Sequence, residues 1–79
     1  MEHRSKVVGV KQSLKAIRQG IAVKVYLADD ADPFIVGPVV DTCKEYGVTI
    51  EYVTSKSALG RKCHIDVGAA VAAEIKFSE

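Results

Sequence analysis

Hydrophobic residues recur along the chain in two alternating spacings, one typical of strands and one typical of helices. Residues 6–10 form a short β-branched run broken by Gly9, which predicts a strand that turns into a helix. The following apolar positions are spaced by four, three and four residues, and Gly20 is expected to end this helix. Alternate apolar positions then predict a strand over Ala22–Ala28. The helical stripe consists of Val10, Leu14, Ile17 and Ile21.

A second helix is predicted after the acidic segment that follows this strand. Asp32 is a favourable N-cap and Pro33 suits the first helical position. Gly37 and Pro38 should kink the helix or delay its regular start, and Gly47 should end it. Its expected apolar stripe consists of Ile35, Val39 and Cys43, with Val36 and Val40 beside it.

The last third of the chain predicts a strand, a short helix and a final strand. The strand covers Val48–Val53, Ser55 can cap a helix that reaches Lys62, and Cys63–Asp66 is a connection. The Ala-rich segment Val67–Phe77 fits both a helical spacing of four and a strand period of two. We expect a strand, because the sheet needs a fourth member. Strands alternating with helices predict one α/β sandwich domain over residues 1–79, with at least one parallel pair.

Composition narrows the class of protein. The chain has 79 residues, of which 48% are hydrophobic, and only 6 Gly and 2 Pro, which excludes a disordered or low-complexity chain. No apolar run approaches the ~20 residues of a membrane helix. Cys43 and Cys63 form no C-x-x-C pair, so we expect reduced thiols in a cytoplasmic protein.

The net charge of +1 conceals a strong asymmetry along the chain. Residues 1–24 carry a balance of +5, residues 25–54 a balance of −5, and residues 55–79 a balance of +1. This pattern favours a polyanionic partner for one face, although charges that only solvate the surface would also fit.

The first predicted helix offers a candidate nucleic-acid surface. Lys11, Lys15 and Arg18 fall within an arc of about 60° on the helix, to one side of its apolar stripe. Gln12 lies in the first turn, where backbone N–H groups are unpaired, and its amide can read a base edge. The alternative is an ordinary solvated amphipathic face.

The acidic segment offers an alternative, enzymatic interpretation. Asp29 and Asp30 follow a predicted strand directly and could hold Mg²⁺ or accept a phosphoryl group. The simpler interpretation is that Asp32 caps the second helix and the other two carboxylates are solvated. Cys63 and His64 with Cys43 do not form a four-ligand zinc set, so no metal site is expected.

Four motifs, in this order, resemble a known family. They are Gly9–Lys15 entering a helix, Ala28–Pro33 after a strand, Ser55–Gly60, and Ile65–Ala70. Together they resemble the kink-turn RNA-binding ribosomal proteins of the L7Ae and L30e type, and most of all the small bacterial ribosomal-protein-like members. The resemblance covers residues 6–75.

The resemblance implies a three-layer α-β-α sandwich around a mixed four-stranded sheet, and a protein that recognises the tandem sheared G·A pairs and bulged bases of kink-turn RNA. Lys11-Gln12 stands where the family has an Asn-Glu pair, and Asp66 stands where a Glu is usual. The implied RNA-binding residues are Gly9, Lys11, Gln12, Lys15, Arg18, Ile65, Asp66 and Val67.

The resemblance also implies a non-enzymatic protein without cofactor or metal, whose partner is RNA, either ribosomal RNA or a structured mRNA element, and not a membrane. We expect a monomer, because one set of α/β layers accounts for the apolar stripes. The N-terminal helix of longer members is expected to be missing or reduced to residues 1–5.

Overall fold

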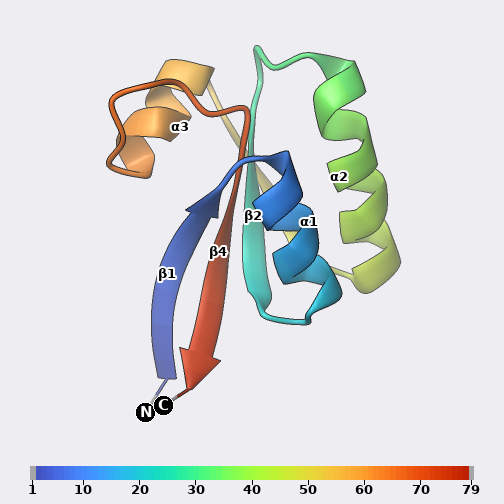
Figure 1. Ribbon diagram of the computed structural model, residues 1–79. Helices are drawn as coiled ribbons and strands as arrows, with labels where there is room; N and C mark the ends of the chain where they lie inside the picture. The colour runs from blue at the N-terminus through green and yellow to red at the C-terminus, as the bar shows by residue number, and fades with distance from the viewer. Residues whose placement is uncertain (1, 79) are drawn as a thin grey trace.

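A computed structural model describes residues 2–78 of the chain (Figure 1). Its elements, in chain order, are β1 (Glu2–Val8), α1 (Val10–Arg18), β2 (Ala22–Ala28), α2 (Pro33–Tyr46), β3 (Thr49–Val53), α3 (Lys56–Lys62) and β4 (Val71–Ser78).

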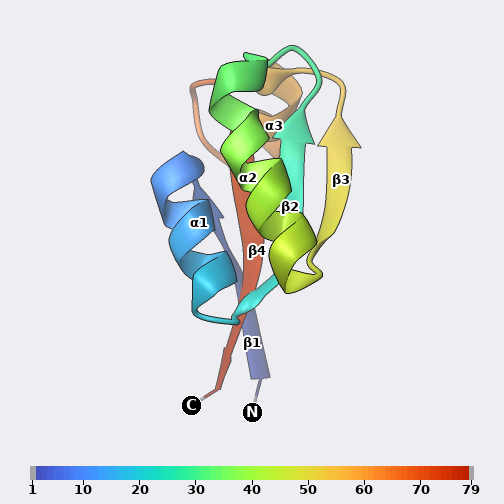
Figure 2. The same cartoon turned by 90° about the vertical axis from the view of Figure 1, so that its right-hand side faces the viewer.

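The four strands form one mixed sheet in the order β1-β4-β2-β3. β4 is antiparallel to both of its neighbours, while β2 and β3 are parallel. Helices α1 and α2 cover one face of the sheet and α3 lies on the other (Figures 1 and 2). The three-layer α/β sandwich with a mixed four-stranded sheet is therefore confirmed.

The two faces of the sheet carry separate hydrophobic cores, because successive side chains of a strand point to opposite faces. The larger core lies under α1 and α2, and its buried members are Ile17, Val25, Leu27, Val39, Cys43, Val71 and Ala73. The smaller core lies under α3, and its buried members are Tyr26, Ala28, Leu59, Ala69 and Ala72. Cys43 is fully buried in the larger core, so its expected packing role is confirmed.

Helix α2 begins as the sequence predicts. The Asp32 carboxylate accepts a hydrogen bond from the Phe34 N–H (2.9 Å), and Gly47 at the other end adopts a left-handed conformation with φ 69°. The helix starts at Pro33 and continues through Pro38, so the alternative of a delayed start is wrong. Ile35 is 46% exposed and not part of the core, whereas its neighbour Val36 packs against the larger core, so the core-facing stripe of α2 runs through Val36 and not through Ile35.

The first strand is longer than predicted. Glu2–Val8 pairs with β4 across seven residues, from Glu2 opposite Ser78 to Val8 opposite Ala72. Since β4 supplies a full set of backbone partners, residues 2–5 continue the strand. Of the two alternatives for the N-terminal helix, missing or reduced to residues 1–5, the second is therefore wrong for the described residues 2–5, and Met1 lies outside them.

The last strand is shorter at its start than predicted. It begins at Val71 and not at Val67, because the Ala69 N–H donates to the carbonyl oxygen of Lys56 in α3 (3.0 Å) and not to a neighbouring strand. Residues 64–70, which we call the α3–β4 loop, therefore have no regular structure. The Ala-rich helix considered for this part of the sequence is wrong.

Within residues 2–78, no helix is both long enough and apolar enough to cross a lipid bilayer.

Candidate nucleic-acid interface

Helix α1 begins at a glycine whose backbone conformation few other residues can adopt. Gly9 has φ 102° and ψ 157°, in a region populated almost only by glycine. Its N–H donates to the carbonyl oxygen of Val71 (2.8 Å), and its carbonyl oxygen accepts from the Ser13 N–H (3.0 Å). The start of α1 is thus bonded to the first residue of β4, directly after the α3–β4 loop.

The N-terminal turn of α1 is uncapped by side chains. Gly9 has no side chain to accept a hydrogen bond, and no acidic residue lies in the first turn. The partial positive charge of the helix N-terminus is therefore left for solvent or an anion. Lys11 adds a full positive charge to the same turn.

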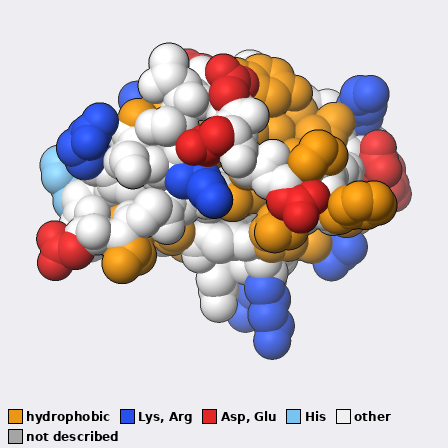
Figure 3. All heavy atoms as spheres, turned by 90° about the horizontal axis from the view of Figure 1, so that it is seen from above, with side chains coloured by type: hydrophobic (Ala, Val, Ile, Leu, Met, Phe, Trp, Pro, Cys, Tyr) orange, Lys and Arg blue, Asp and Glu red, His pale blue; other side chains and the backbone are white. Residues whose placement is uncertain are grey.

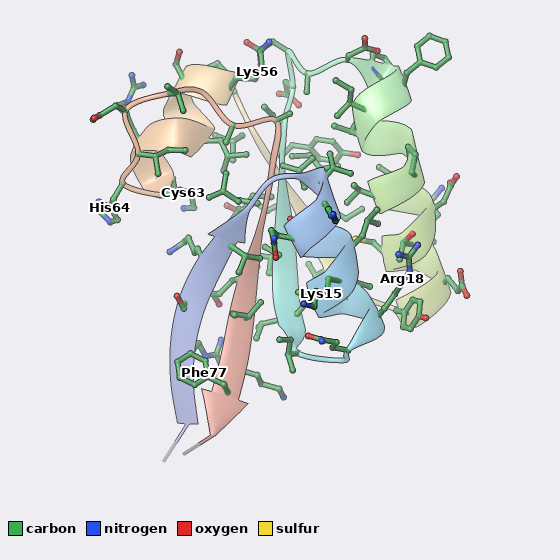
Figure 4. The ribbon with its side chains drawn as sticks, in the orientation of Figure 1. Lys15, Arg18, Lys56, Cys63, His64 and Phe77 are labelled. Atoms are coloured by element: carbon green, nitrogen blue, oxygen red, sulfur yellow. The ribbon has the colours of Figure 1, made fainter. Side chains whose placement is uncertain are left out.

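The polar side of α1 faces solvent as the sequence predicts. Ser13, Ala16 and Ile17 are buried against the sheet and α2. In Figure 4 Lys15 lies in the middle part of α1, while Arg18 lies further from the α3–β4 loop. The four polar residues proposed to contact RNA from this helix are all exposed: Lys11, Gln12, Lys15 and Arg18.

The α3–β4 loop leaves its helix through a left-handed residue. His64 has φ 60°, a conformation uncommon for residues other than glycine. The His64 N–H donates to Arg61 and the Ile65 N–H to Gly60 (both 3.0 Å), which is the Schellman arrangement at a helix C-terminus. The turn at His64 directs residues 65–69 back along α3 toward Lys56.

Two glycines allow the loop to lie directly against α3. A methyl group on Gly60 would overlap the carbonyl oxygen of Val67. A methyl group on Gly68 would come within 3.1 Å of Lys56 Cβ. The last contact is the hydrogen bond from the Ala69 N–H to the Lys56 carbonyl oxygen. The path of the loop is therefore fixed by backbone contacts with α3.

The three loop residues proposed to contact RNA differ in exposure. Ile65 is half-buried and packs against the smaller core, so it anchors the loop. Asp66 is exposed, and Val67 is 69% exposed. Val67 is therefore the apolar side chain that the loop offers to solvent.

Helix α1 and the loop meet at the same end of the sheet. Besides the bond between Gly9 and Val71, the Ala28 N–H at the end of β2 donates to the Ala70 carbonyl oxygen (3.0 Å). Figure 3 looks down on this end and shows Lys and Arg side chains projecting at its lower edge, in a part of the view without Asp or Glu. The arrangement brings the start of α1 and the end of the α3–β4 loop to one end of the sheet.

The acidic segment is used for helix caps. The Asp30 carboxylate accepts a hydrogen bond from the Lys56 N–H (2.8 Å) at the start of α3, and Asp32 caps α2. Two of the three carboxylates thus have structural partners, which weakens the phosphoryl-transfer interpretation. In the described part of the chain, no three His, Cys, Asp or Glu residues group closely enough to hold a metal ion.

The thiol of the α3 C-terminus is not activated. Burial raises the pKa of Cys63, although nearby Lys6 and Lys62 act in the opposite direction. A thiol with a raised pKa stays protonated near neutral pH and is a poor nucleophile. Lys62 lies instead over the ring of Tyr26, with Nζ 5.0 Å from the ring centre.

Sequence reasoning missed three residues that shape this end of the molecule. Asp30 was interpreted as solvated or enzymatic, because its partner Lys56 is 26 positions away. His64 occupies the position where glycine is the usual signal, so nothing in the sequence indicated the turn. Gly60 looks like an unfavourable residue within a helix until the carbonyl group of Val67 is placed against it.

Comparison with known proteins identifies relatives over nearly the whole chain. Residues 1–79 match the model of the ribosomal protein L7Ae/L30e/S12e/Gadd45 family. A protein of Caldanaerobacter subterraneus named RNA-binding protein is 44% identical over 70 residues, which cover 89% of this chain and 85% of that protein. A Geobacillus stearothermophilus protein, RNA-binding protein YbxF, is 39% identical over the same shares.

Solved structures share the fold. The Giardia lamblia 15.5kD RNA binding protein superposes with a TM-score of 0.84 and 36% identity, over 95% of this chain. This chain spans 62% of the length of the Giardia chain. A Bacillus halodurans protein of unknown function gives a TM-score of 0.80 and 25% identity, over 87% of this chain and 69% of its own. The chain therefore belongs to the ribosomal protein L7Ae/L30e/S12e/Gadd45 family.

Proposed function

We propose that this protein binds kink-turn RNA through the exposed side of α1 and the α3–β4 loop. The observation that carries the proposal is the hydrogen bond between Gly9 and Val71, which holds the uncapped start of α1 beside the loop. The names of the relatives, which describe them as RNA-binding proteins, support a role in RNA binding.

The chemistry of the two segments suits a sharply bent RNA. An A-form helix closes its major groove to side chains, whereas a kink opens the groove and exposes purine edges. Lys11 can donate to guanine O6 and N7, and the Gln12 amide can pair with both donor and acceptor edges. Lys15 and Arg18 can neutralise phosphates that the bend draws together.

The loop supplies a different kind of contact. An unstacked base has an apolar face that needs cover and offers no hydrogen-bond pattern there. Val67, exposed on a loop of fixed path, can cover such a face. A protein that binds only the kinked conformer shifts the RNA population toward it, so no catalytic step or cofactor is required. We propose that the protein acts in this way as a monomer on a cytoplasmic RNA, ribosomal or messenger.

The test is a mobility-shift titration with three RNAs of equal length: a kink-turn, the same RNA with its sheared G·A pairs replaced by Watson–Crick pairs, and a plain duplex. We expect tight binding to the first alone. If about 4–6 phosphates are neutralised, log K should fall against log salt with a slope of about −3 to −5. Equal affinity for all three RNAs, or affinity independent of salt, would overturn the proposal.

A further inference from the structure

Asp30 connects the end of β2 to the start of α3. It lies two residues after the strand, and its Oδ1 accepts a hydrogen bond from the backbone N–H of Lys56 (2.8 Å). Ser55 Oγ accepts from the Ala58 N–H (3.0 Å) in the same turn. These two bonds satisfy backbone donors that a helix start leaves unpaired.

Lys56 also contacts the end of the α3–β4 loop. Its carbonyl oxygen accepts from the Ala69 N–H (3.0 Å), and its Cβ lies beside the Cα of Gly68, where a methyl group would approach to 3.1 Å. In Figure 4 Lys56 lies at the end of α3 nearest the top of β2. Asp30 and Ala69 are therefore bonded to the two backbone polar groups of a single residue.

Helix α3 depends on such contacts because it is short. Its seven residues form fewer than two helical turns, and an isolated helix of this length is unstable in water. A carboxylate at the helix N-terminus also interacts favourably with the helix dipole. Without the Asp30 carboxylate, the first turn of α3 can move or fray, and Ala69 loses the fixed position of its acceptor.

We infer that Asp30 is a positioning residue for RNA recognition: through Lys56 it fixes the α3–β4 loop in the path that presents Val67. This inference rests on the proposed function. It makes a prediction opposite in sign to simple electrostatics, in which loss of an acidic residue should strengthen binding to every RNA. Positioning predicts a loss confined to the kink-turn.

The chain offers matched controls for this experiment. Asp30→Asn keeps an acceptor oxygen at the same position. Asp29→Ala removes the same charge from an exposed carboxylate that accepts no hydrogen bond from any described residue. Asp32→Ala removes a comparable cap from α2, which does not hold the loop. Each variant is titrated with the kink-turn and with the plain duplex, after its thermal unfolding has been measured.

We expect Asp30→Ala to lower the ratio of kink-turn to duplex affinity roughly tenfold, the scale of a lost cap, while its salt slope stays that of the wild type. Asp30→Asn should restore the ratio, and Asp29→Ala and Asp32→Ala should leave it unchanged. A ratio that Asp30→Ala does not lower, or that falls equally in Asp32→Ala, would overturn the inference.

Amide hydrogen exchange in the free protein separates this inference from the proposed function. In Asp30→Ala the Ala69 amide should exchange at least about tenfold faster relative to Leu27 in β2, as expected when a local opening replaces a fixed bond. Unchanged exchange at Ala69 would overturn the role of Asp30, whatever the RNA result. A wild-type protein that does not prefer the kink-turn would overturn the proposed function, and the exchange experiment would still decide whether Asp30 holds the loop.

Discussion

The two halves of the proposed interface are built in different ways. Helix α1 has nine residues and stands on the larger core, which it shares with α2. The α3–β4 loop stands on the smaller core and is held by single backbone contacts with a seven-residue helix.

The two halves therefore contribute differently to the proposed RNA binding: α1 contributes charge, and the loop contributes shape complementarity. Polar and cationic side chains on α1 tolerate small movements of the backbone, because long side chains can adjust their rotamers. A loop that covers one base depends on where its backbone lies. Substitutions that move the loop should therefore reduce the preference for the kink-turn over other RNAs. Substitutions on the basic side of α1 should reduce the affinity for every RNA.

The largest expected effect comes from Gly60→Ala. The added methyl group would overlap the backbone oxygen of Val67, which cannot rotate away, so the loop must move or α3 must lose packing. We expect the free energy of unfolding to fall by about 3 kcal/mol, and selectivity for the kink-turn to fall with it. Urea unfolding and the RNA titration measure the two effects.

Gly37→Ala is the matched control for this variant. Gly37 also lies within a helix, but a methyl group there would meet nothing within 4 Å. Alanine should then stabilise the protein by about 0.5–1 kcal/mol, through helix propensity alone. If Gly60→Ala is as well tolerated as Gly37→Ala, the loop is not fixed by its contact with α3.

On α1, Gln12→Ala and Arg18→Ala should separate base reading from phosphate attraction. Gln12→Ala removes a base-edge contact of about 1–3 kcal/mol and should weaken kink-turn binding alone. Arg18→Ala should weaken kink-turn and duplex binding alike and reduce the salt slope by roughly one. Equal selectivity in the two variants would mean that α1 does not read bases.

His64→Gly should stabilise the protein without changing its interface. Glycine adopts the left-handed conformation of this residue without steric cost, but it also increases the entropy of the unfolded chain. We expect the free energy of unfolding to rise by about 0.5–1 kcal/mol after both effects. Thermal unfolding checks the gain. His64→Val, which is β-branched and disfavours positive φ, should instead destabilise the protein.

The smallest expected effect is on the pH dependence of stability, and it concerns the two thiols, one at each core. Burial raises the pKa of Cys43 above its ordinary value of 9.0, and that of Cys63 as well. As the pH rises, each thiol ionises in the unfolded chain before it ionises in the folded protein. The free energy of unfolding is therefore unaffected by these thiols below pH 9, and it falls as the pH rises toward their pKa values in the folded protein. Urea unfolding between pH 7.5 and pH 10 should show a smaller alkaline loss in Cys43→Ala than in the wild type. An identical slope in that variant would assign the loss to other groups, such as Tyr26, whose pKa burial also raises.

Much of the fold could be predicted from the sequence, because the spacing of apolar residues and the residues at helix ends determine it locally. The spacing of apolar residues located α1, and Asp32 with Pro33 located the start of α2. The start of β4 was misplaced by four residues, because the alternation of apolar residues continues through Val67 and Ala69 although their backbone turns toward α3. Contacts between segments far apart in the sequence decided that boundary, and a periodic pattern does not contain them.

The candidate site could be predicted only in part, because some of it also depends on contacts between distant segments of the chain. The exposed side of α1 follows from its own periodicity, so the exposure of Lys11, Gln12, Lys15 and Arg18 could be predicted. The link from Asp30 to Lys56 could not, since it depends on the position of α3 above the end of β2. The division of the loop into a half-buried Ile65 and an exposed Val67 likewise depends on the smaller core.

The pairing of β1 with β4 has a practical consequence. Glu2 lies opposite Ser78, and this pair lies at the far end of the two strands from the starts of α1 and α2 (Figure 1). Seven residues of strand span about 23 Å, so a fluorophore or surface tether attached at Glu2 or Ser78 would stand clear of the start of α1 and of the α3–β4 loop. A short linker could also join Glu2 to Ser78, and the chain could be reopened between α2 and β3, to give a circular permutant of residues 2–78 that keeps the contacts between α1 and the α3–β4 loop.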